Sequence, residues 1–319
     1  MMKQYDVTAL GELLIDFTSC GVSGRGNPLM EANPGGAPCN VLAMLARLGR
    51  STAFIGKVGR DSFGDQLQAA LKEAGIHTEG LQRDADVPTT LAFVHTGEGG
   101  ERSFTFYRRP GADMMLHPEE TPQGVIAASR VLHFGSLSMT DEPCRSATKT
   151  AVAAAEEAGV LRSFDPNLRP ALWHSMEDAR AQISWALAHC DVLKVADNEL
   201  AFLSGTENED GGLAWLRKNT TARLILLTKG AAGSRALMDD KDVAEPAFSV
   251  VPVDTTGAGD TFCACALHHV LEKGLGMLNE AGLRRMLRFA NAAAALVTTR
   301  WGALRSMPSP QEIDSLLRA

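Results

Sequence analysis

A glycine-rich turn is the part of this sequence best suited to chemistry. The residues VDTTGAGDTF, at 253–262, directly precede an apolar run at 263–271. Gly257 and Gly259 allow backbone conformations and close approaches that side chains prevent. Where such a turn opens a helix, free backbone N–H groups and the positive end of the helix dipole meet and favour an anion such as phosphate. We therefore predict an anion-binding turn, in which Asp260 is either a helix cap or a catalytic carboxylate.

Other glycine patterns do not offer a second phosphate site. No GxxxxGK[ST] string occurs in the sequence. The GVSGRG string at 21–26 has its glycines in the wrong order for a dinucleotide fingerprint and follows no clear junction between a strand and a helix. We interpret this string as part of a loop.

The elements around the turn follow a regular alternation. Apolar or β-branched runs recur, and most precede a stretch with helical periodicity, as at 37–48 and 63–74, which end at Gly49 and Gly75. An alanine-rich helix is predicted at 283–298. This alternation is typical of an α/β fold with a central, mostly parallel sheet and helices on both faces. The predicted strands are 6–10, 52–55, 130–134, 160–164, 191–195 and 224–228.

Two segments, 13–34 and 88–109, interrupt the alternation. In the second, LAFVH and RSFTFY flank GEGGE, which predicts a β-hairpin. We expect Phe93, Phe104 and Phe106 on one face, which so small a unit must bury against something else. The prediction is a small β lid on a core made of residues 1–12, 35–87 and 110–319, with the lid joining two copies in a homodimer.

Composition narrows the class of partner. The chain has 31 basic and 38 acidic residues, a net charge of −7, and no basic block, which disfavours nucleic acid and anionic membranes. No apolar run reaches the roughly 18 residues of a membrane span, and no secretion signal is visible. The six cysteines lack zinc-type spacing and are expected to be reduced thiols. We expect a cytoplasmic protein that acts on a small molecule.

Several ordered motifs give the chain a family resemblance. It resembles the ribokinase-like, or pfkB-type, carbohydrate kinases, whose two signatures correspond to PGGAPCN at 34–40 and DTTGAGDTF at 254–262. The resemblance extends nearly from end to end, and within the family it is strongest to bacterial fructokinases. The intervening motifs are GKVGRDSFG at 56–64, PTTLAFV at 88–94, GERSFTFYRRPGAD at 100–113, SFDPNLRPALW at 163–173 and LLTKGAAGS at 226–234.

The resemblance implies a phosphoryl transfer in which Asp260 accepts the proton of a sugar hydroxyl. The backbone of Gly257, Ala258 and Gly259, together with that of Asp260, would stabilise the phosphoryl group. This agrees with the chemistry, which needs an in-line hydroxyl, a destination for its proton and neutralisation of the phosphoryl oxygens. The sugar-contacting positions implied by the resemblance are Asp16, Gly35, Gly36, Asn40, Tyr107, Arg109 and Arg169.

The resemblance also implies sites for ATP, Mg²⁺ and K⁺. The family's Asn-x-x-Glu element, tied to magnesium and phosphate, aligns with Ala196 to Glu199, so that the family's asparagine is replaced by Ala196. The nucleotide positions are Asn167, Glu199, Thr228, Lys229, Gly230, Gly233 and Asn291. The monovalent-cation positions, which use carbonyl and carboxylate oxygens, are Asp254, Thr256, Val297, Arg300, Gly302 and Ser306.

The resulting hypothesis is an ATP-dependent fructokinase that forms fructose 6-phosphate. A 2-keto-3-deoxygluconate kinase is an alternative in which Arg109 or Arg169 would meet the acidic substrate. A nucleoside-type kinase, including aminoimidazole riboside kinase, is a third possibility. A regulator that binds sugar or nucleotide without turnover is the non-enzymatic alternative, which intact Gly257, Gly259 and Asp260 disfavour.

Overall fold

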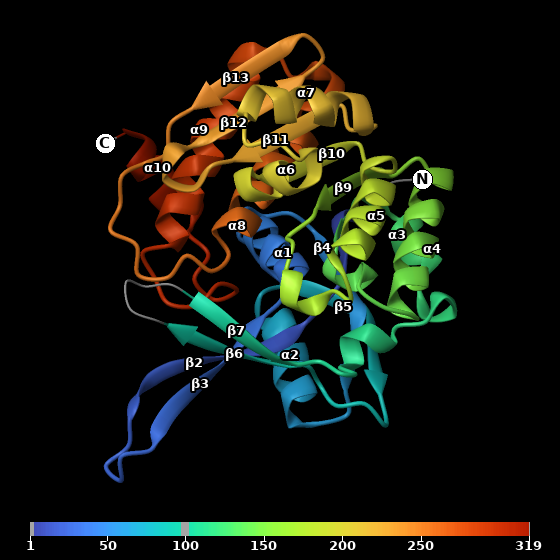
Figure 1. The fold of residues 1–319 in the computed structure, drawn as a ribbon, viewed down its shortest axis with the longest axis vertical. Coiled ribbons are helices and arrows are strands. Elements are labelled where there is room, and N and C mark those ends of the chain that lie inside the picture. The colour runs from blue at the N-terminus through green and yellow to red at the C-terminus, as the bar shows by residue number, and fades with distance from the viewer. Residues whose placement is uncertain (1–2, 97–101, 319) are drawn as a thin grey trace.

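A nine-stranded sheet forms the centre of the molecule (Figure 1). The structure is a computed structural model and describes residues 3–96 and 102–318. The strand order is β13-β12-β11-β10-β9-β8-β1-β4-β5, and the pairs from β11 to β5 are parallel. These strands are β1 Tyr5–Leu10, β4 Thr52–Gly59, β5 Ile76–Asp84, β8 Ser129–Gly135, β9 Leu161–Asp165, β10 Val192–Ala196, β11 Leu224–Thr228, β12 Ser234–Met238 and β13 Lys241–Glu245.

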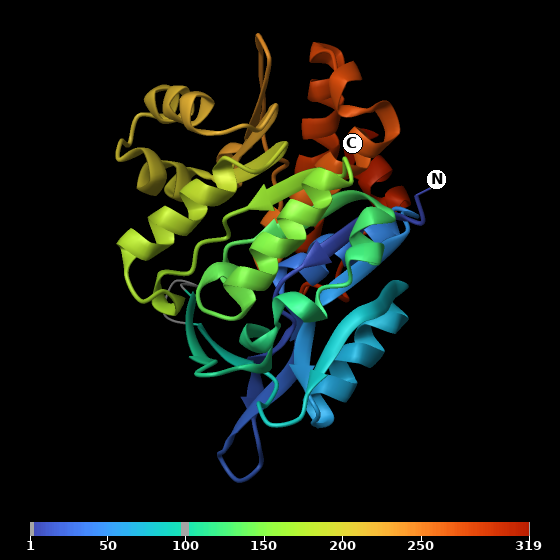
Figure 2. The ribbon, with the colours of Figure 1, turned by 90° about the vertical axis from the view of Figure 1, so that its right-hand side faces the viewer.

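Helices cover both faces of this sheet, as the alternation predicts (Figure 2). One buried apolar cluster joins the sheet to α1 Ala37–Arg47, α2 Ser62–Glu73, α8 Ala258–Lys273, α9 Glu280–Val297 and α10 Pro310–Arg318. A second cluster joins the other face to α3 Gln123–Ala127, α4 Cys144–Glu157, α5 Met176–Leu187, α6 Asp197–Ser204 and α7 Glu209–Asn219. Among the helices of the described chain, none combines the length and apolar character that a membrane crossing requires.

Two short strands at the sheet edge were not indicated by the sequence. β12 and β13 are antiparallel to their neighbours and extend the sheet beyond β11, so that β13 is the edge strand. Their sequences, SRALM and KDVAE, contain too few consecutive apolar residues to stand out as buried strands. The segment that follows β13 lines a cavity together with the amino-terminal end of α8.

A separate four-stranded sheet has the order β3-β2-β6-β7 and projects from the main body at the bottom of Figure 1. It consists of β2 Leu14–Val22, β3 Pro28–Gly35, β6 Leu91–Thr96 and β7 Arg102–Tyr107. The predicted hairpin is therefore β6–β7, while its GEGGE turn at 97–101 lies outside the described residues. The two segments that interrupt the alternation thus supply all four strands.

The register of the small sheet corrects the expectation that three phenylalanines share a face. Phe93 pairs with Thr105, whereas Phe106 pairs with Ala92. Because directly paired residues point to the same face and neighbours along a strand alternate, Phe93 lies on the face opposite Phe106. There Phe93 stacks on Phe17, with ring centroids 4.9 Å apart. The loop between two strands sets their relative register, and a count of residues within each strand could not supply it.

Candidate active site

The first turn of α8 lies where the carboxyl ends of the central strands meet. Gly257 precedes the helix with φ of 79°, a left-handed conformation that favours glycine. A Cβ atom at this position would lie 2.8 Å from Cβ of Ala303. Both the backbone conformation and the lack of space therefore require glycine at position 257. The N–H groups of the first helical turn have no carbonyl partner four residues earlier, so they can bind an anion.

Asp260 is buried at this turn and contacts α1. Its side-chain Oδ2 accepts a hydrogen bond of 2.8 Å from Nδ2 of Asn40. Burial raises the pKa of Asp260 to about 6, and the nearby Asp165 carboxylate adds to the rise, while the Asn40 hydrogen bond opposes it. A carboxylate with a pKa just below neutrality is mostly ionised at pH 7 yet can accept a proton, as a general base must.

Asn40 has a second polar atom that no described residue satisfies. The residue is 4% exposed, and its Oδ1 is buried without a hydrogen-bond partner in the described chain. An unsatisfied buried acceptor costs about 1–3 kcal/mol, so it favours a ligand that brings a donor. A ligand hydroxyl group beside Asp260 would supply such a donor.

A cavity of about 430 Å³ opens in front of Asp260. The small sheet supplies Asp16 and Phe106 to its wall, and the register explains why, since both pair with Ala92 and so share a face. The loops that follow β1 and β9 of the main sheet supply Glu12, Asn167 and Arg169. Polar groups and one aromatic ring therefore line a space within the usual size range of small-molecule sites.

Glu12 is a site residue that sequence reasoning missed. It is 3% exposed, and its Oε1 accepts a hydrogen bond of 2.8 Å from the backbone N–H of Ala37 in the first turn of α1. Burial raises the pKa of Glu12 to about 7. Like Asp16, it is an acid within an apolar stretch, and that signal was available in the sequence.

Lys194 and Asp165 also went unnoticed. Lys194 lies within β10 and Asp165 ends the neighbouring strand β9, and their ion pair, with Nζ 3.1 Å from Oδ2, is almost fully buried. Lys194 lines the cavity beside the first turn of α8. A lysine within the otherwise apolar run 192–195 was the signal that could have identified it, because such a residue needs a buried partner.

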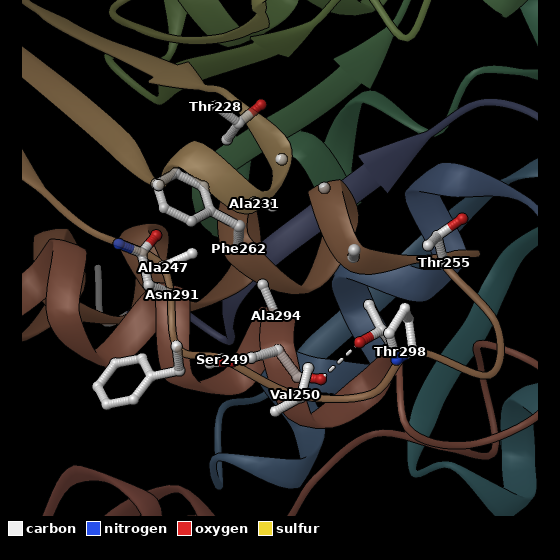
Figure 3. A pocket seen from close by; sticks show the side chains of 17 residues that line it. Thr228, Ala231, Ala247, Ser249, Val250, Thr255, Phe262, Asn291, Ala294 and Thr298 are labelled. Carbon is white, nitrogen blue, oxygen red and sulfur yellow. Dashed lines mark hydrogen bonds between the residues drawn. The ribbon is translucent and has the colours of Figure 1, made fainter.

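A second cavity, of about 470 Å³, lies on the other side of the α8 amino terminus (Figure 3). Phe248, Phe262 and alanines of α9 make its wall mostly apolar. Thr255, Ala258 and Gly259 line both cavities. The two spaces therefore meet at the anion-binding turn, an arrangement suited to moving a charged group from one ligand to the other.

Comparison with known proteins agrees with this arrangement. Residues 4–310 match the family described as pfkB family carbohydrate kinase. The chain belongs to this family. It is therefore a carbohydrate kinase, and the sugar-kinase resemblance of the sequence motifs is confirmed.

Individual relatives of the kinase are fructokinases. It is 43% identical to probable fructokinase-4 of Arabidopsis thaliana over 314 residues, which cover 98% of this chain and 96% of that protein. A crystal structure of Xylella fastidiosa fructokinase with bound ATP aligns with a TM-score of 0.90 and 32% identity, covering 98% of both chains. A fructokinase double mutant from Vibrio cholerae O395, bound to fructose, ADP and potassium ion, aligns with a TM-score of 0.88 and 32% identity over 99% of both chains.

Most of the predicted sugar positions of the kinase gather around one cavity. Asp16, Gly36, Asn40, Arg169 and the 257–260 turn line it. Gly35 is placed behind Asp16, where a Cβ atom would collide with that carboxylate. Tyr107 and Arg109 are exposed, and the register puts Tyr107 on the outer face of the small sheet, with its ring against Phe93. Phe106 occupies the inner position instead.

The predicted nucleotide positions divide between the two cavities. Gly230, Gly233 and Asn291 line the second, apolar cavity. Asn167 and Glu199 line the cavity in front of Asp260, hereafter the sugar-side cavity, and Thr228 lines both. The Lys229 ammonium is 3.0 Å from the Glu209 carboxylate, which draws it to the α7 side. The Asn291 amide bonds Ser234 and the backbone carbonyls of Glu245 and Pro246, so its polar atoms brace the cavity wall.

The predicted cation positions surround a buried carboxylate. Asp254 is 2% exposed and accepts hydrogen bonds from the N–H groups of Thr256, at 2.7 Å, and Gly302, at 3.1 Å. These bonds join the 254–256 loop to the loop that follows Val297, the last residue of α9, and that contains Arg300 and Ser306. Arg300 can offer a cation only its backbone carbonyl, because its guanidinium group is itself a cation without an acceptor atom; that group pairs with Glu312.

Proposed function

We propose that this kinase is a fructokinase that transfers the terminal phosphoryl group of ATP to the 6-hydroxyl of D-fructose. The observation that carries the proposal is the Asn40–Asp260 hydrogen bond at the junction of the two cavities. Support comes from the fructokinase relatives, one with ATP bound and another with fructose, ADP and potassium. Because ATP is an intracellular nucleotide, we propose the cytoplasm as the compartment.

In the proposed reaction, Asp260 takes the proton of the attacking hydroxyl as that oxygen bonds to phosphorus. The bond between phosphorus and the leaving ADP oxygen breaks on the opposite side. The N–H groups of the α8 first turn stabilise negative charge on the phosphoryl oxygens. Asn40 holds Asp260 through Oδ2 and offers its own Oδ1 to a neighbouring sugar hydroxyl.

Magnesium fits a carboxylate donor on the wall of the sugar-side cavity. Both oxygens of Glu199 accept backbone N–H groups, from Leu168 and Ala196, at 2.8 Å each. These bonds fix the carboxylate at the cavity wall and leave lone pairs for metal-bound water, a mode of binding that Mg²⁺ prefers. The alanine at 196 removes one amide from this wall. When bound with ATP, Mg²⁺ would neutralise phosphate charge.

We predict that K⁺ raises the rate above that in Na⁺ or in a large organic cation. The Asp254 carboxylate and the carbonyls of two joined loops form an oxygen-rich donor set directly beside the α8 turn. A cation there would order the 254–256 loop and so fix the position of the 257–260 turn that follows it. The measurement is kcat in the presence of Mg²⁺ with each monovalent chloride at equal ionic strength. Equal rates in K⁺ and tetramethylammonium would contradict the prediction.

Substrate choice is tested by comparing kcat/KM for fructose, 2-keto-3-deoxygluconate and ribose. We expect fructose to be the best substrate, because Asp16 and Glu12 are acceptors for hydroxyl groups and an ionised Asp16 repels a substrate carboxylate. Arg169, on the same wall, is the observation that favours ketodeoxygluconate as second candidate. A kcat/KM for ketodeoxygluconate tenfold above that for fructose would overturn the choice of sugar.

We further propose that segments 13–34 and 88–109 act as a lid through which two copies of the kinase form a dimer. Leu29 and Val22, on the projecting β2–β3 hairpin, are 45% and 67% exposed, and Tyr107 on the edge strand is 65% exposed. Exposed apolar groups next to an unpaired strand edge favour association. Sedimentation is expected to give a dimer at micromolar concentration, and Leu29→Glu is expected to weaken it. A stable monomer at that concentration would contradict this proposal.

A further inference from the structure

We propose that Lys194 is a further catalytic residue, whose ammonium group contacts the phosphoryl group during its transfer. The inference rests on the proposed function, because it assigns a role within the same site. It extends that function by naming a positive charge that belongs to the protein and is present before any ligand binds.

The position of Lys194 is the first argument. It lies near the end of β10, is 5% exposed, and lines the sugar-side cavity where that cavity meets the first turn of α8. Within the described chain, its Nζ is bonded to Asp165, at 3.2 Å from Oδ1 and 3.1 Å from Oδ2. An ammonium group has three N–H donors, so one remains for a ligand.

Gly259 supplies the second argument. Unlike Gly257, it lies within α8 and is not in the left-handed region, so backbone conformation does not require glycine there. A Cβ atom at 259 would lie 3.1 Å from Nζ of Lys194 and 3.5 Å from its Cε. The glycine therefore leaves room for the ammonium group directly against the turn that binds the anion. An acceptor held by that turn is within reach of the lysine.

The surrounding charges keep the lysine ionised. Burial alone would lower its pKa, but the carboxylates of Asp165, Glu199 and Asp260 raise the pKa of Lys194 above its ordinary value. His133, behind it on β8, contributes no charge at neutral pH, because burial and the lysine lower the pKa of His133 to about 3. Arg169, on the loop after β9, also lines the cavity. Its positive charge lowers the pKa of Asp260 and so favours the carboxylate form.

The chemistry requires such a charge. As the sugar oxygen bonds to phosphorus and the bond to the ADP oxygen breaks, charge is spread over three phosphoryl oxygens. The hydroxyl proton goes to Asp260, so Lys194 keeps all three of its protons throughout. A fixed ammonium group in a water-poor site stabilises this charge more than water does, because it needs no reorientation.

The test compares Lys194→Met with a matched buried lysine. Lys57, on β4, is 6% exposed and pairs with Glu120 at 2.8 Å and Asp84 at 3.3 Å, outside the site. Lys194→Met is expected to lower kcat about 100-fold, while KM for the sugar and Kd for ADP change less than about threefold. Lys57→Met is expected to lower Tm but leave kcat per folded molecule unchanged.

A transition-state mimic separates catalysis from folding. The affinity for ADP with aluminium fluoride and sugar is expected to fall about 100-fold in Lys194→Met, in parallel with kcat. If Lys194→Met does not fold, the double variant Lys194→Met with Asp165→Asn, which leaves no unpaired buried charge, is measured against Asp165→Asn. A kcat within threefold of its reference, or a mimic affinity that falls no more than ADP affinity, would overturn the inference.

The wild-type enzyme is assayed first, with fructose, ketodeoxygluconate and ribose. Failure to phosphorylate fructose contradicts the proposed substrate. The Lys194 comparison then uses the sugar that is turned over, so the two failures remain distinguishable.

Discussion

Replacement of Asp260 by asparagine is expected to lower kcat about 1,000-fold, within the range usual for loss of a general base. The amide has nearly the same size, and its oxygen can still accept the hydrogen bond from Asn40 that is 2.8 Å long in the wild type. It cannot take the proton of the sugar hydroxyl. Kd for ATP, measured by calorimetry, is expected to change less than about threefold.

The pH profile gives an independent test of the same assignment. A base acts in its deprotonated form, so kcat/KM of the wild type is expected to rise as pH passes through about 6 and to level off above it, in line with the raised pKa of Asp260. The residual activity of Asp260→Asn is expected to lack this step. A variant with turnover within tenfold of wild type, or with the same step near pH 6, would exclude Asp260 as the base.

The sequence was sufficient for the features that depend on local pattern. The apolar runs indicated the parallel strands because a sheet covered on both faces is apolar throughout, as in β4, where all eight residues are buried. Gly49 and Gly75 marked helix ends because both adopt left-handed backbone conformations just after α1 and α2. The turn at 257–260 was evident for the same reason, since Gly257 also adopts a left-handed backbone conformation.

Features that depend on distant pairing could not be obtained in this way. Asn40 contacts Asp260 across 220 positions of the chain, and only the packing of α1 on α8 brings them together. The resemblance implied that Tyr107 contacts the sugar, but Phe106 faces the cavity instead. This depends on the register of the small sheet, which a single strand does not reveal. The ion pair of Lys194 could not be predicted, because its partner Asp165 lies on the neighbouring strand.

Ionisable residues within apolar stretches indicated more site residues than the family resemblance did. Asp16 was recognised as an acid in an apolar stretch, and the same criterion applies to Glu12 and Lys194, which are 3% and 5% exposed. Burying an ionisable group is unfavourable unless it is paired or binds a ligand. Lys57 satisfies the criterion without lining the site, because it pairs with Asp84 and Glu120. The criterion therefore selects candidates, and the lining of the cavity separates them: Lys194 lines the cavity in front of Asp260, whereas Lys57 is not among the described residues that line either cavity.

Gly257→Ala is expected to lower kcat about 1,000-fold, because it displaces several phosphate donors together. Alanine in the left-handed region costs about 1–2 kcal/mol, and its Cβ atom would also lie 2.8 Å from Cβ of Ala303, so the turn must move. Gly75→Ala is the matched control, since Gly75 has φ of 76° with open space around its Cβ position. It carries the same conformational cost without the collision. Both variants are expected to have a lower Tm because of the left-handed backbone, and the collision is expected to lower the Tm of Gly257→Ala further. The kcat per folded molecule is expected to fall only in Gly257→Ala. Equal kcat in the two variants would mean that the geometry of the α8 turn does not limit phosphoryl transfer.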